Sequence, residues 1–232
     1  MQIASGLHSL SQTRGGRVHA FLIEDGDDLT LVDTLYDEDA GVILAELSAM
    51  GRKPGDIKYI LLTHSHKSHL GGLASIAKAS GAKVMAHEWE IPVIEGRRKA
   101  EKVGFKLPRP FNAEVYSLQI GLNIGLGKHT PVKIEDRLSK GMRIGKLEVL
   151  EVPGHTPGCV AFWIPKEKIL IAGDTVATWP VIDLGWPTFN LDSVSAQASV
   201  GKLSELNPEI VCVGHGEPIT QGATDVLRSL KK

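Results

Sequence analysis

Residues 63–72 of the chain read Thr63-His64-Ser65-His66-Lys67-Ser68-His69-Leu70-Gly71-Gly72, with three histidines inside six positions. The apolar run at 58–63 predicts a buried strand before them, and a helical pattern begins at Gly71. The histidines are therefore expected on a strand-to-helix loop at a sheet edge, where three imidazoles can point at one centre. Imidazole binds zinc, iron and related metals, so this stretch predicts a metal site. The alternative interpretation is a run of solvated surface histidines.

Three further predicted strands end in a similar way. The strand at 147–152 leads into Pro153-Gly154-His155, the strand at 168–172 into Gly173-Asp174, and the strand at 210–213 into Gly214-His215. Sheet edges are where α/β proteins gather their sites. Four strand ends that each present a histidine or an aspartate therefore predict one convergent site.

The rest of the chain is typical of an α/β protein. Strand and helix patterns alternate as β-α-β-α-β in the first half, which favours a sheet with helices packed on it, and the second half repeats the order of strand then helix. We expect strands at 19–24, 28–33, 58–63, 83–86, 143–152, 160–164, 168–172 and 210–213, and helices at 37–50, 71–79, 193–206 and 220–230. Nothing resembles a linker, so residues 1–232 are expected to form a single domain.

Two segments are candidates for the walls of a pocket. The region at about 90–131 reads as a short helix followed by an irregular excursion, which is either a binding loop or a surface insertion without a role. The loop at 179–190 carries Trp179, Trp186 and Phe189, which either form apolar pocket walls or pack in the core.

Four histidines lie outside the pattern of strand ends. His8 and His129 are expected at the surface. His19 and His87 lie near strand ends that could approach the site, so both are candidates for contact with a substrate.

Composition and charge exclude several classes of partner. The chain has 232 residues, of which 42% are hydrophobic, and its formal net charge is −1, so nucleic acid and membrane surfaces are not expected partners. The N-terminus lacks the pattern of a secretory signal, and no apolar run reaches the ~18 residues of a transmembrane helix, so a cytoplasmic protein is expected. Cys159 and Cys212 lie in apolar strand-like runs, which favours buried free thiols over a disulfide. The sequence makes no prediction of the oligomeric state.

Taken together, these residues resemble the metallo-β-lactamase-fold superfamily, whose hallmark is HxHxDH followed by a distant histidine, aspartate and histidine. The resemblance extends from Asp33 to His215 and so covers nearly the whole chain. It implies an α/β fold of the αββα sandwich type, with two mixed β-sheets flanked by helices and a binuclear metal site along one edge.

The resemblance also implies six metal ligands. The first metal would be bound by His64, His66 and His155 and the second by His69 and His215, with Asp174 bridging the two. Asp33 matches the family's first motif, an aspartate near the site that supports the histidine loop. The alternative interpretation of Asp33 is a turn residue after a strand.

The sequence departs from the family pattern at Ser68, which occupies the aspartate position of HxHxDH. In the family that carboxylate binds the second metal and orients the nucleophilic water or accepts its proton. A serine hydroxyl is a poor ligand and no base near neutral pH, and the charged Lys67 would repel a metal. The second metal is therefore expected to bind more weakly, and one-metal occupancy is an alternative. Four explanations of this residue remain open: natural divergence, an engineered knock-out, an enzyme of low activity, or a former enzyme that has become a binding protein.

The function that the resemblance implies is hydrolysis by metal-bound hydroxide. A bound metal lowers the pKa of its water to about 7, with Asp174 as a proton acceptor in place of the missing aspartate. We expect one or two zinc ions, with iron or manganese as alternatives, and a small ester, lactone, lactam or phosphoester as the substrate of a lactonase-like enzyme. Classical β-lactamases usually carry cysteine or serine where this chain has Asp174, which argues against that identity.

Two other functions remain open at the level of sequence. One is a catalytically impaired or non-enzymatic metal-binding relative, because of Ser68. The other is an enzyme like the persulfide dioxygenases, which use a single iron on a similar set of histidines to oxidise a sulfur substrate.

Overall fold

Two mixed β-sheets form the framework of the chain, and each belongs to a separate compact unit. A computed structural model describes residues 1–231. The first unit comprises residues 1–14, 18–100 and 128–138, and the second comprises residues 15–17, 101–127 and the chain from 139 onward. The expectation of a single domain over residues 1–232 stays a prediction.

The first unit is built on a seven-stranded sheet in which the strands follow the order of the chain. Its strands are β1 (Gln2–Ala4), β2 (Leu7–Gln12), β3 (Val18–Asp25), β4 (Asp28–Val32), β5 (Ile57–Leu61), β6 (Lys83–His87) and β7 (Asp136–Leu138). The pairs from β1 to β4 are antiparallel and those from β4 to β7 are parallel. Because β4, β5 and β6 are parallel, their carboxyl ends meet at one edge, and the histidine stretch follows β5 at that edge.

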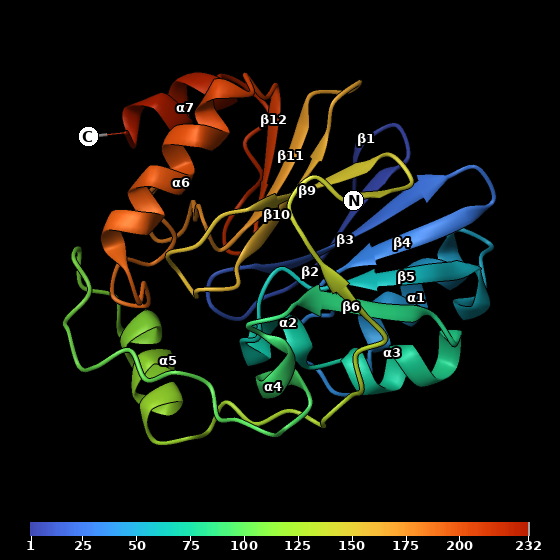
Figure 1. Ribbon diagram of the computed structural model, residues 1–232, viewed down its shortest axis with the longest axis horizontal. Helices are drawn as coiled ribbons and strands as arrows, with labels where there is room; N and C mark the ends of the chain where they lie inside the picture. The colour runs from blue at the N-terminus through green and yellow to red at the C-terminus, as the bar shows by residue number, and fades with distance from the viewer. Residues whose placement is uncertain (232) are drawn as a thin grey trace. The chain divides into compact units, whose positions relative to one another are not determined.

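The helices of this unit cover one face of its sheet (Figure 1). They are α1 (Gly41–Ala49), α2 (Lys67–Leu70), α3 (Leu73–Ser80) and α4 (Ile91–Ile94), with a short 3₁₀-helix at Pro54–Asp56. Ile43 and Leu47 of α1 and Ile76 of α3 share one apolar cluster with Leu31 of β4 and Ile60 of β5, and all five are buried. Each such side chain contributes about 1.5–3 kcal/mol when it is fully buried, so this face holds the helices on the sheet.

The second unit is built on a five-stranded sheet of order β12-β11-β10-β9-β8. Its elements are α5 (Ala113–Asn123), β8 (Arg143–Ile144), β9 (Leu147–Glu151), β10 (Val160–Ile164), β11 (Ile169–Gly173), α6 (Ser193–Glu205), β12 (Ile210–Val213) and α7 (Ala223–Ser229). Strands β11 and β12 are parallel, and the other pairs are antiparallel. Strands β9, β11 and β12 therefore run in the same direction and end at one edge of the sheet.

Helices α6 and α7 pack side by side on one face of this second sheet (Figure 1). Val200 and Leu203 of α6 and Leu227 of α7 share a buried cluster with Leu170 of β11. Asp192 caps the start of α6 by accepting hydrogen bonds from the side chain and backbone of Ser195, which lower the pKa of its carboxyl group. None of the helices formed by residues 1–231 is long and apolar enough to cross a membrane.

The structure corrects the predicted helix at 37–50 and the predicted strand at 143–152. Helix α1 begins only at Gly41, because Ala40 has a left-handed backbone (φ 55°) that no α-helix can include. The strand is divided into β8 and β9, since Gly145 between them also has a positive φ of 55° and turns the chain.

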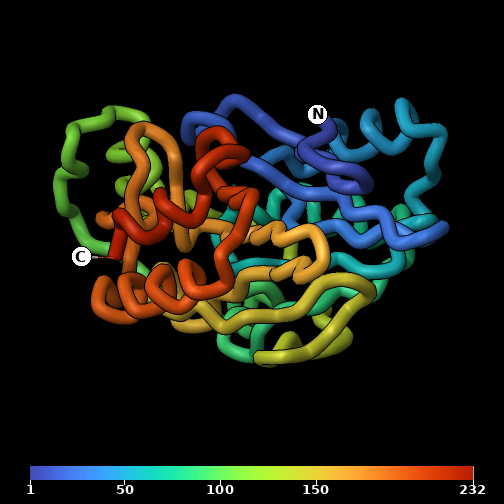
Figure 2. The backbone as a smooth tube through the Cα atoms, turned by 90° about the horizontal axis from the view of Figure 1, so that it is seen from above, coloured from blue at the N-terminus to red at the C-terminus, as the bar shows by residue number. Residues whose placement is uncertain are grey.

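The structure also contains elements that the sequence patterns did not predict. Strands β1, β2 and β7 were not expected, and helix α5 occupies part of the segment expected to be irregular. Residues 101–112, in green in Figure 2, form a loop that leads into α5. Asn112 caps this helix by accepting a hydrogen bond from the backbone N–H of Val115, 3.0 Å away. Asn112 is a residue type that commonly caps helices. Gly121 nevertheless argued against a helix here, because glycine usually weakens one.

Both cysteines are buried free thiols, as predicted. Cys212 lies in β12, and burial raises the pKa of its thiol. A thiol held protonated is a poor nucleophile and a poor metal ligand. Cys212 therefore serves packing.

Candidate metal centre

His64 and His66 lie just beyond the end of β5, and their ring nitrogens already lie at a spacing suited to one metal ion. The Nε2 atom of His64 is 3.1 Å from the Nδ1 atom of His66, and both rings are buried. Two nitrogens on one tetrahedral zinc ion lie about 3.3 Å apart, because each bond is about 2.0–2.1 Å long. The two imidazoles are therefore oriented as a ready pair of ligands.

Asp33 is the residue that holds this histidine stretch in place. It follows β4 with a left-handed backbone (φ 61°), which aims its buried carboxylate at the neighbouring strand end. Its Oδ1 atom accepts the backbone N–H of Thr63 at 2.9 Å, and its Oδ2 atom accepts the Thr63 hydroxyl at 2.7 Å. Oδ2 also accepts the Nδ1–H of His69 at 2.8 Å. A carboxylate can only accept here, so His69 carries its proton on Nδ1 and keeps the lone pair of Nε2 for a metal.

The same chain of hydrogen bonds fixes the tautomer of His64. The Thr63 hydroxyl gives its proton to Asp33, so it acts as an acceptor toward His64 Nδ1, 3.0 Å away. His64 therefore donates from Nδ1 and presents the lone pair of Nε2. One buried aspartate thus sets the donor atoms of two of the predicted ligands.

Ser68 and His69 lie in the short helix α2, whereas the sequence predicted a loop until Gly71. The backbone carbonyl of His69 accepts hydrogen bonds from Thr34, from the backbone N–H at 2.8 Å and from the hydroxyl at 2.7 Å. Gly71 passes so close to the chain after β4 that a Cβ there would lie 1.9 Å from the carbonyl oxygen of Tyr36. Only glycine permits this approach, which seats α2 against the strand end that carries Asp33.

Glu90 is a buried residue of this site that sequence reasoning missed. Its carboxylate accepts hydrogen bonds from the backbone N–H of Ser65 at 3.1 Å and from the Ser65 hydroxyl. Ser65 lies between the two histidines of the pair, so Glu90 fixes the turn that separates them. No local pattern could have indicated a contact across 25 positions.

Asp174 is the centre of the ligand group in the second unit. It directly follows β11, while His215 follows β12 and His155 follows β9, and these strands end at the same edge. The Oδ2 atom of Asp174 is 3.5 Å from Nε2 of His155 and 3.6 Å from Nε2 of His215. These distances are long for hydrogen bonds but close to the about 3.4 Å between two ligands of one tetrahedral ion. A single carboxylate oxygen thus lies at the spacing of a fellow metal ligand from both histidines.

Both histidines beside Asp174 are held through their other ring nitrogen. His155 donates from Nδ1 to the side-chain oxygen of Asn190 at 3.2 Å, and His215 donates from Nδ1 to the carbonyl oxygen of Gly15 at 2.9 Å. Asn190 is itself oriented by its amide group, which donates to the carbonyl oxygen of Leu184 at 2.8 Å. Neutral histidines with a proton on Nδ1 turn the lone pair of Nε2 toward Asp174.

The aromatic residues of the loop at 179–190 pack around these two histidines. Trp186 stacks at a tilt on His215, with ring centroids 4.2 Å apart, and Phe189 stacks on His155 with centroids 6.5 Å apart. Both aromatic side chains are buried in one cluster with Val115 of α5. The apolar shell lowers the local dielectric and strengthens every charge interaction at Asp174.

Lys67 is directed away from a ligand role. Its ammonium group donates to the carboxylate of Glu38 at 2.7 Å, and this hydrogen bond lowers the pKa of the Glu38 carboxyl group. Ser68 is buried next to His69 with only 5% of its surface exposed. The position of the family's aspartate is therefore enclosed, and its side chain is a hydroxyl.

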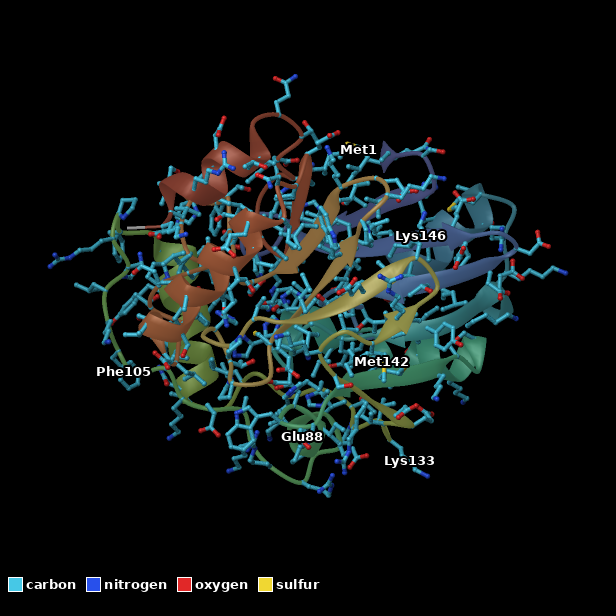
Figure 3. The ribbon with its side chains drawn as sticks, turned by 45° about the horizontal axis from the view of Figure 1, so that its top comes forward. Met1, Glu88, Phe105, Lys133, Met142 and Lys146 are labelled. Atoms are coloured by element: carbon cyan, nitrogen blue, oxygen red, sulfur yellow. The ribbon has the colours of Figure 1, made fainter. Side chains whose placement is uncertain are left out.

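The remaining histidines differ from the expectations in part. His8 and His129 are half-buried and not freely exposed, because His8 bonds to Glu24 at 2.8 Å and His129 to the carbonyl oxygen of Ile94 at 2.9 Å. His19 is buried in β3, 2.6 Å from the Ser9 hydroxyl. His87 lines a cavity of about 520 Å³ together with Glu88, which is labelled in Figure 3. Contact of His19 or His87 with a substrate stays a prediction.

Replacing Asp33 with asparagine is expected to weaken metal binding by about 10–100-fold, the usual effect of losing a group that orients a ligand. The amide carries no charge and its nitrogen cannot accept, so it cannot satisfy the three donors that meet Asp33. Zinc affinity is measured by competition with a chromogenic chelator, with Asp25→Asn as the control at the exposed end of β3. Unchanged affinity in a folded Asp33→Asn protein would contradict this role.

Known proteins resemble the chain over most of its length. The profile described as the metallo-beta-lactamase superfamily matches residues 13–215. The chain is 27% identical to the probable metallo-hydrolase YflN of Bacillus subtilis, over 94% of this chain and 87% of that protein. It is 28% identical to a hydroxyacylglutathione hydrolase of Cereibacter sphaeroides, over 85% of this chain and 62% of that longer protein.

Solved structures show the same fold. A metallo-beta-lactamase family protein from Thermus thermophilus matches with a TM-score of 0.72 and 25% identity, over 99% of this chain and 79% of that chain. TTHA1623, solved in a di-iron-bound form, matches with a TM-score of 0.68 and 26% identity, over 96% of this chain and 98% of that chain. The predicted fold class, α/β with two mixed β-sheets flanked by helices, is confirmed. Buried histidine and aspartate donors in this fold imply a divalent metal. The chain belongs to the metallo-β-lactamase superfamily.

Proposed function

We propose that the chain is a metal-dependent hydrolase with two metal positions that share Asp174. The observation that carries this proposal is the geometry of the Asp174 carboxylate, whose Oδ2 atom lies 3.5 and 3.6 Å from Nε2 of two different histidines. A bridging carboxylate oxygen stands at about this distance from the other ligands of its ions.

The ligand assignment follows from the donor atoms that each histidine presents. A first ion would be held by Nε2 of His64, Nδ1 of His66 and Nε2 of His155, and a second by Nε2 of His69 and Nε2 of His215, with Asp174 common to both. Hydrogen bonds that leave Nε2 as the lone-pair atom support four of these five nitrogens. Asp33 then acts through His69 and Thr63 as the residue that orients the first unit's ligands.

The chemistry that a bound divalent ion supplies is a hydroxide nucleophile at neutral pH and polarisation of the scissile bond. The residues of the chain orient this process. Asp174 is the one carboxylate in the ligand set and is therefore the acceptor for the proton released from the nucleophilic water. Ser68 cannot share this task, because a hydroxyl is not a base near pH 7.

The substrate class that we propose is a small ester, lactone or lactam, with a phosphoester as the less favoured member. Hydroxyacylglutathione hydrolases occur among the relatives, and their name denotes an acyl substrate, which favours carbonyl substrates. Zinc is the proposed metal, and the di-iron form of TTHA1623 makes iron the alternative.

Metal analysis combined with a substrate panel tests the proposal. Purified protein equilibrated with zinc is expected to hold one ion tightly and a second more weakly, and to hydrolyse at least one carbonyl substrate. Removal of the metal with a chelator is expected to abolish turnover, and added zinc to restore it.

Other outcomes of this experiment have clear meanings. If the protein holds a single iron tightly and consumes a sulfur substrate only with oxygen, its activity is that of a dioxygenase and not of a hydrolase. No tightly held metal and no turnover would indicate a binding protein that kept only the fold.

A further inference from the structure

The second unit contains a cavity of about 340 Å³ that has no role in metal binding. Two segments far apart in the sequence form its walls, one leading into α5 and the other in the loop at 179–190. The lining residues are Lys106, Leu107, Pro108, Arg109, Pro110, Val115, Pro180, Val181, Asp183, Gly185, Trp186, Pro187 and Thr188. Phe105, labelled in Figure 3, lies on the first of these segments and is 65% exposed. The volume is within the range of small-molecule sites, which starts at about 300 Å³.

The cavity shares a wall with Asp174 and His215. Trp186 lines the cavity and also stacks on the His215 ring at 4.2 Å. Gly185, the preceding residue, passes so close to Asp174 that a Cβ there would lie 2.2 Å from its carbonyl oxygen. Only the indole ring of Trp186 would thus separate a molecule in the cavity from His215, a proposed metal ligand of the same unit.

The walls of the cavity are mainly apolar. Four prolines together with Leu107, Val115, Val181 and Trp186 supply hydrocarbon surface. Leu107 is 61% exposed and Val181 is 40% exposed, which is costly for apolar side chains unless a ligand covers them. This lining suits an alkyl or aryl group.

The polar groups of the cavity favour a negative charge on that ligand. Lys106 and Arg109 are exposed and form no ion pair among residues 1–231. Asp183 is the one acidic residue of the lining. The buried hydroxyl oxygen of Thr188 has no hydrogen-bond partner in the described chain, so it can bond a polar atom of a ligand.

We propose that this cavity binds the apolar arm of an anionic substrate, that is, an acyl group of medium length that ends in a carboxylate. The alkyl portion lies against Trp186, Leu107 and Val181, and the carboxylate pairs with Lys106 and Arg109. The inference rests on the proposed function only for the statement that this ligand is a substrate. Binding itself needs no turnover and is tested separately.

Calorimetric titration of the full chain with octanoate, octanol and octylammonium tests the binding. Octanoate is expected to bind at least about fivefold more tightly than octanol, and octylammonium more weakly than both, because two cations face the ligand. The Lys106→Glu/Arg109→Glu protein is expected to lose the preference for octanoate, whereas Lys102→Glu, with the same kind of charge change outside the lining, keeps it. Equal affinity for the three ligands, or no binding of any, would overturn the proposal.

A second pair of variants tests the apolar wall. Leu107→Ser/Val181→Ser is expected to weaken octanoate binding, and to reduce the gain of about fourfold per methylene between hexanoate and octanoate that burial provides. Ile124→Ser/Leu126→Ser is the matched control, since these two residues are also exposed but do not line the cavity. An equal loss of affinity in both double variants would contradict a specific site.

Turnover separates a failure of this inference from a failure of the proposed function. With zinc bound, the 4-nitrophenyl half-ester of suberic acid is expected to have at least about fivefold higher kcat/KM than 4-nitrophenyl octanoate, and charge reversal at Lys106 and Arg109 is expected to remove the difference. Octanoate binding without hydrolysis of either ester would refute the hydrolase and leave the site standing. Hydrolysis of both esters at equal rates, without selective binding, would refute the site and leave the hydrolase standing.

Discussion

Replacing Asp174 with alanine is expected to lower kcat/KM by at least about 10³-fold, well beyond the 10–100-fold effect of losing a group that only orients a ligand. Its Oδ2 atom is the only carboxylate oxygen placed 3.5 and 3.6 Å from Nε2 of His155 and His215 among the residues that the structure describes. Alanine removes the shared ligand and the proposed proton acceptor together. We expect zinc content and activity to fall in parallel.

The measurement compares zinc content by elemental analysis with kcat/KM on the best substrate of the panel. Asp225→Ala is the control, because Asp225 is exposed on α7 and lies in the same unit. Asp174→Asn adds a sharper comparison, since the amide retains the shape of the carboxylate but has no charge to hold a second ion. An Asp174→Ala protein that keeps both its metal and its activity would refute the bridging assignment.

The α/β class and the positions of the candidate ligands could be predicted because they depend on local patterns, whereas the sandwich of two sheets was implied by the resemblance to a known family. A run of apolar residues followed by a polar residue beside glycine marks the end of a buried strand, and this pattern placed Asp174 directly after β11 and His215 two residues after β12. Those two strands are parallel neighbours in one sheet, so their carboxyl ends meet. The sequence therefore predicted which residues stand at the edges of the sheets.

The residues that orient the ligands could not be predicted, because their contacts cross long distances in the chain. Glu90 reaches Ser65 over 25 positions and Asn190 reaches His155 over 35, and neither residue belongs to a motif. Gly15 contributes only a backbone carbonyl to His215, so no side chain at position 15 indicates this contact in the sequence. Buried polar groups need partners, but the fold decides which partners are available.

The missed elements have a related cause. Strands β1 and β2 alternate only weakly between apolar and polar residues, and their place in the sheet comes from the pairing of β2 with β3 and of β1 with β2. Helix α5 is stabilised by its Asn112 cap and by the contact of Val115 with Trp186 and Phe189. In both cases tertiary packing decides an element for which the local preference is small.

Replacing Ser68 with aspartate is expected to raise the affinity for the second zinc ion by at least about 10²-fold, because one charge-assisted ligand is restored beside His69. kcat/KM is expected to rise with it at limiting zinc. Ser68→Asn is the matched control, since asparagine has the same shape as aspartate and lacks its charge. The affinity is measured by chelator competition, and the rates are measured across a range of zinc concentrations.

The stability of the metal-free protein gives an independent readout of the same substitution. Position 68 is only 5% exposed, so an aspartate there without a metal is a buried charge and is expected to lower the Tm of the zinc-free protein. Zinc binds the folded chain and neutralises that charge, so the Tm gain on adding zinc should be larger in Ser68→Asp than in the unsubstituted protein or in Ser68→Asn. If zinc raises the Tm of all three proteins equally and the rate does not change, the carboxylate at this position does not face the metal, and Ser68 is not the reason for a weak second site.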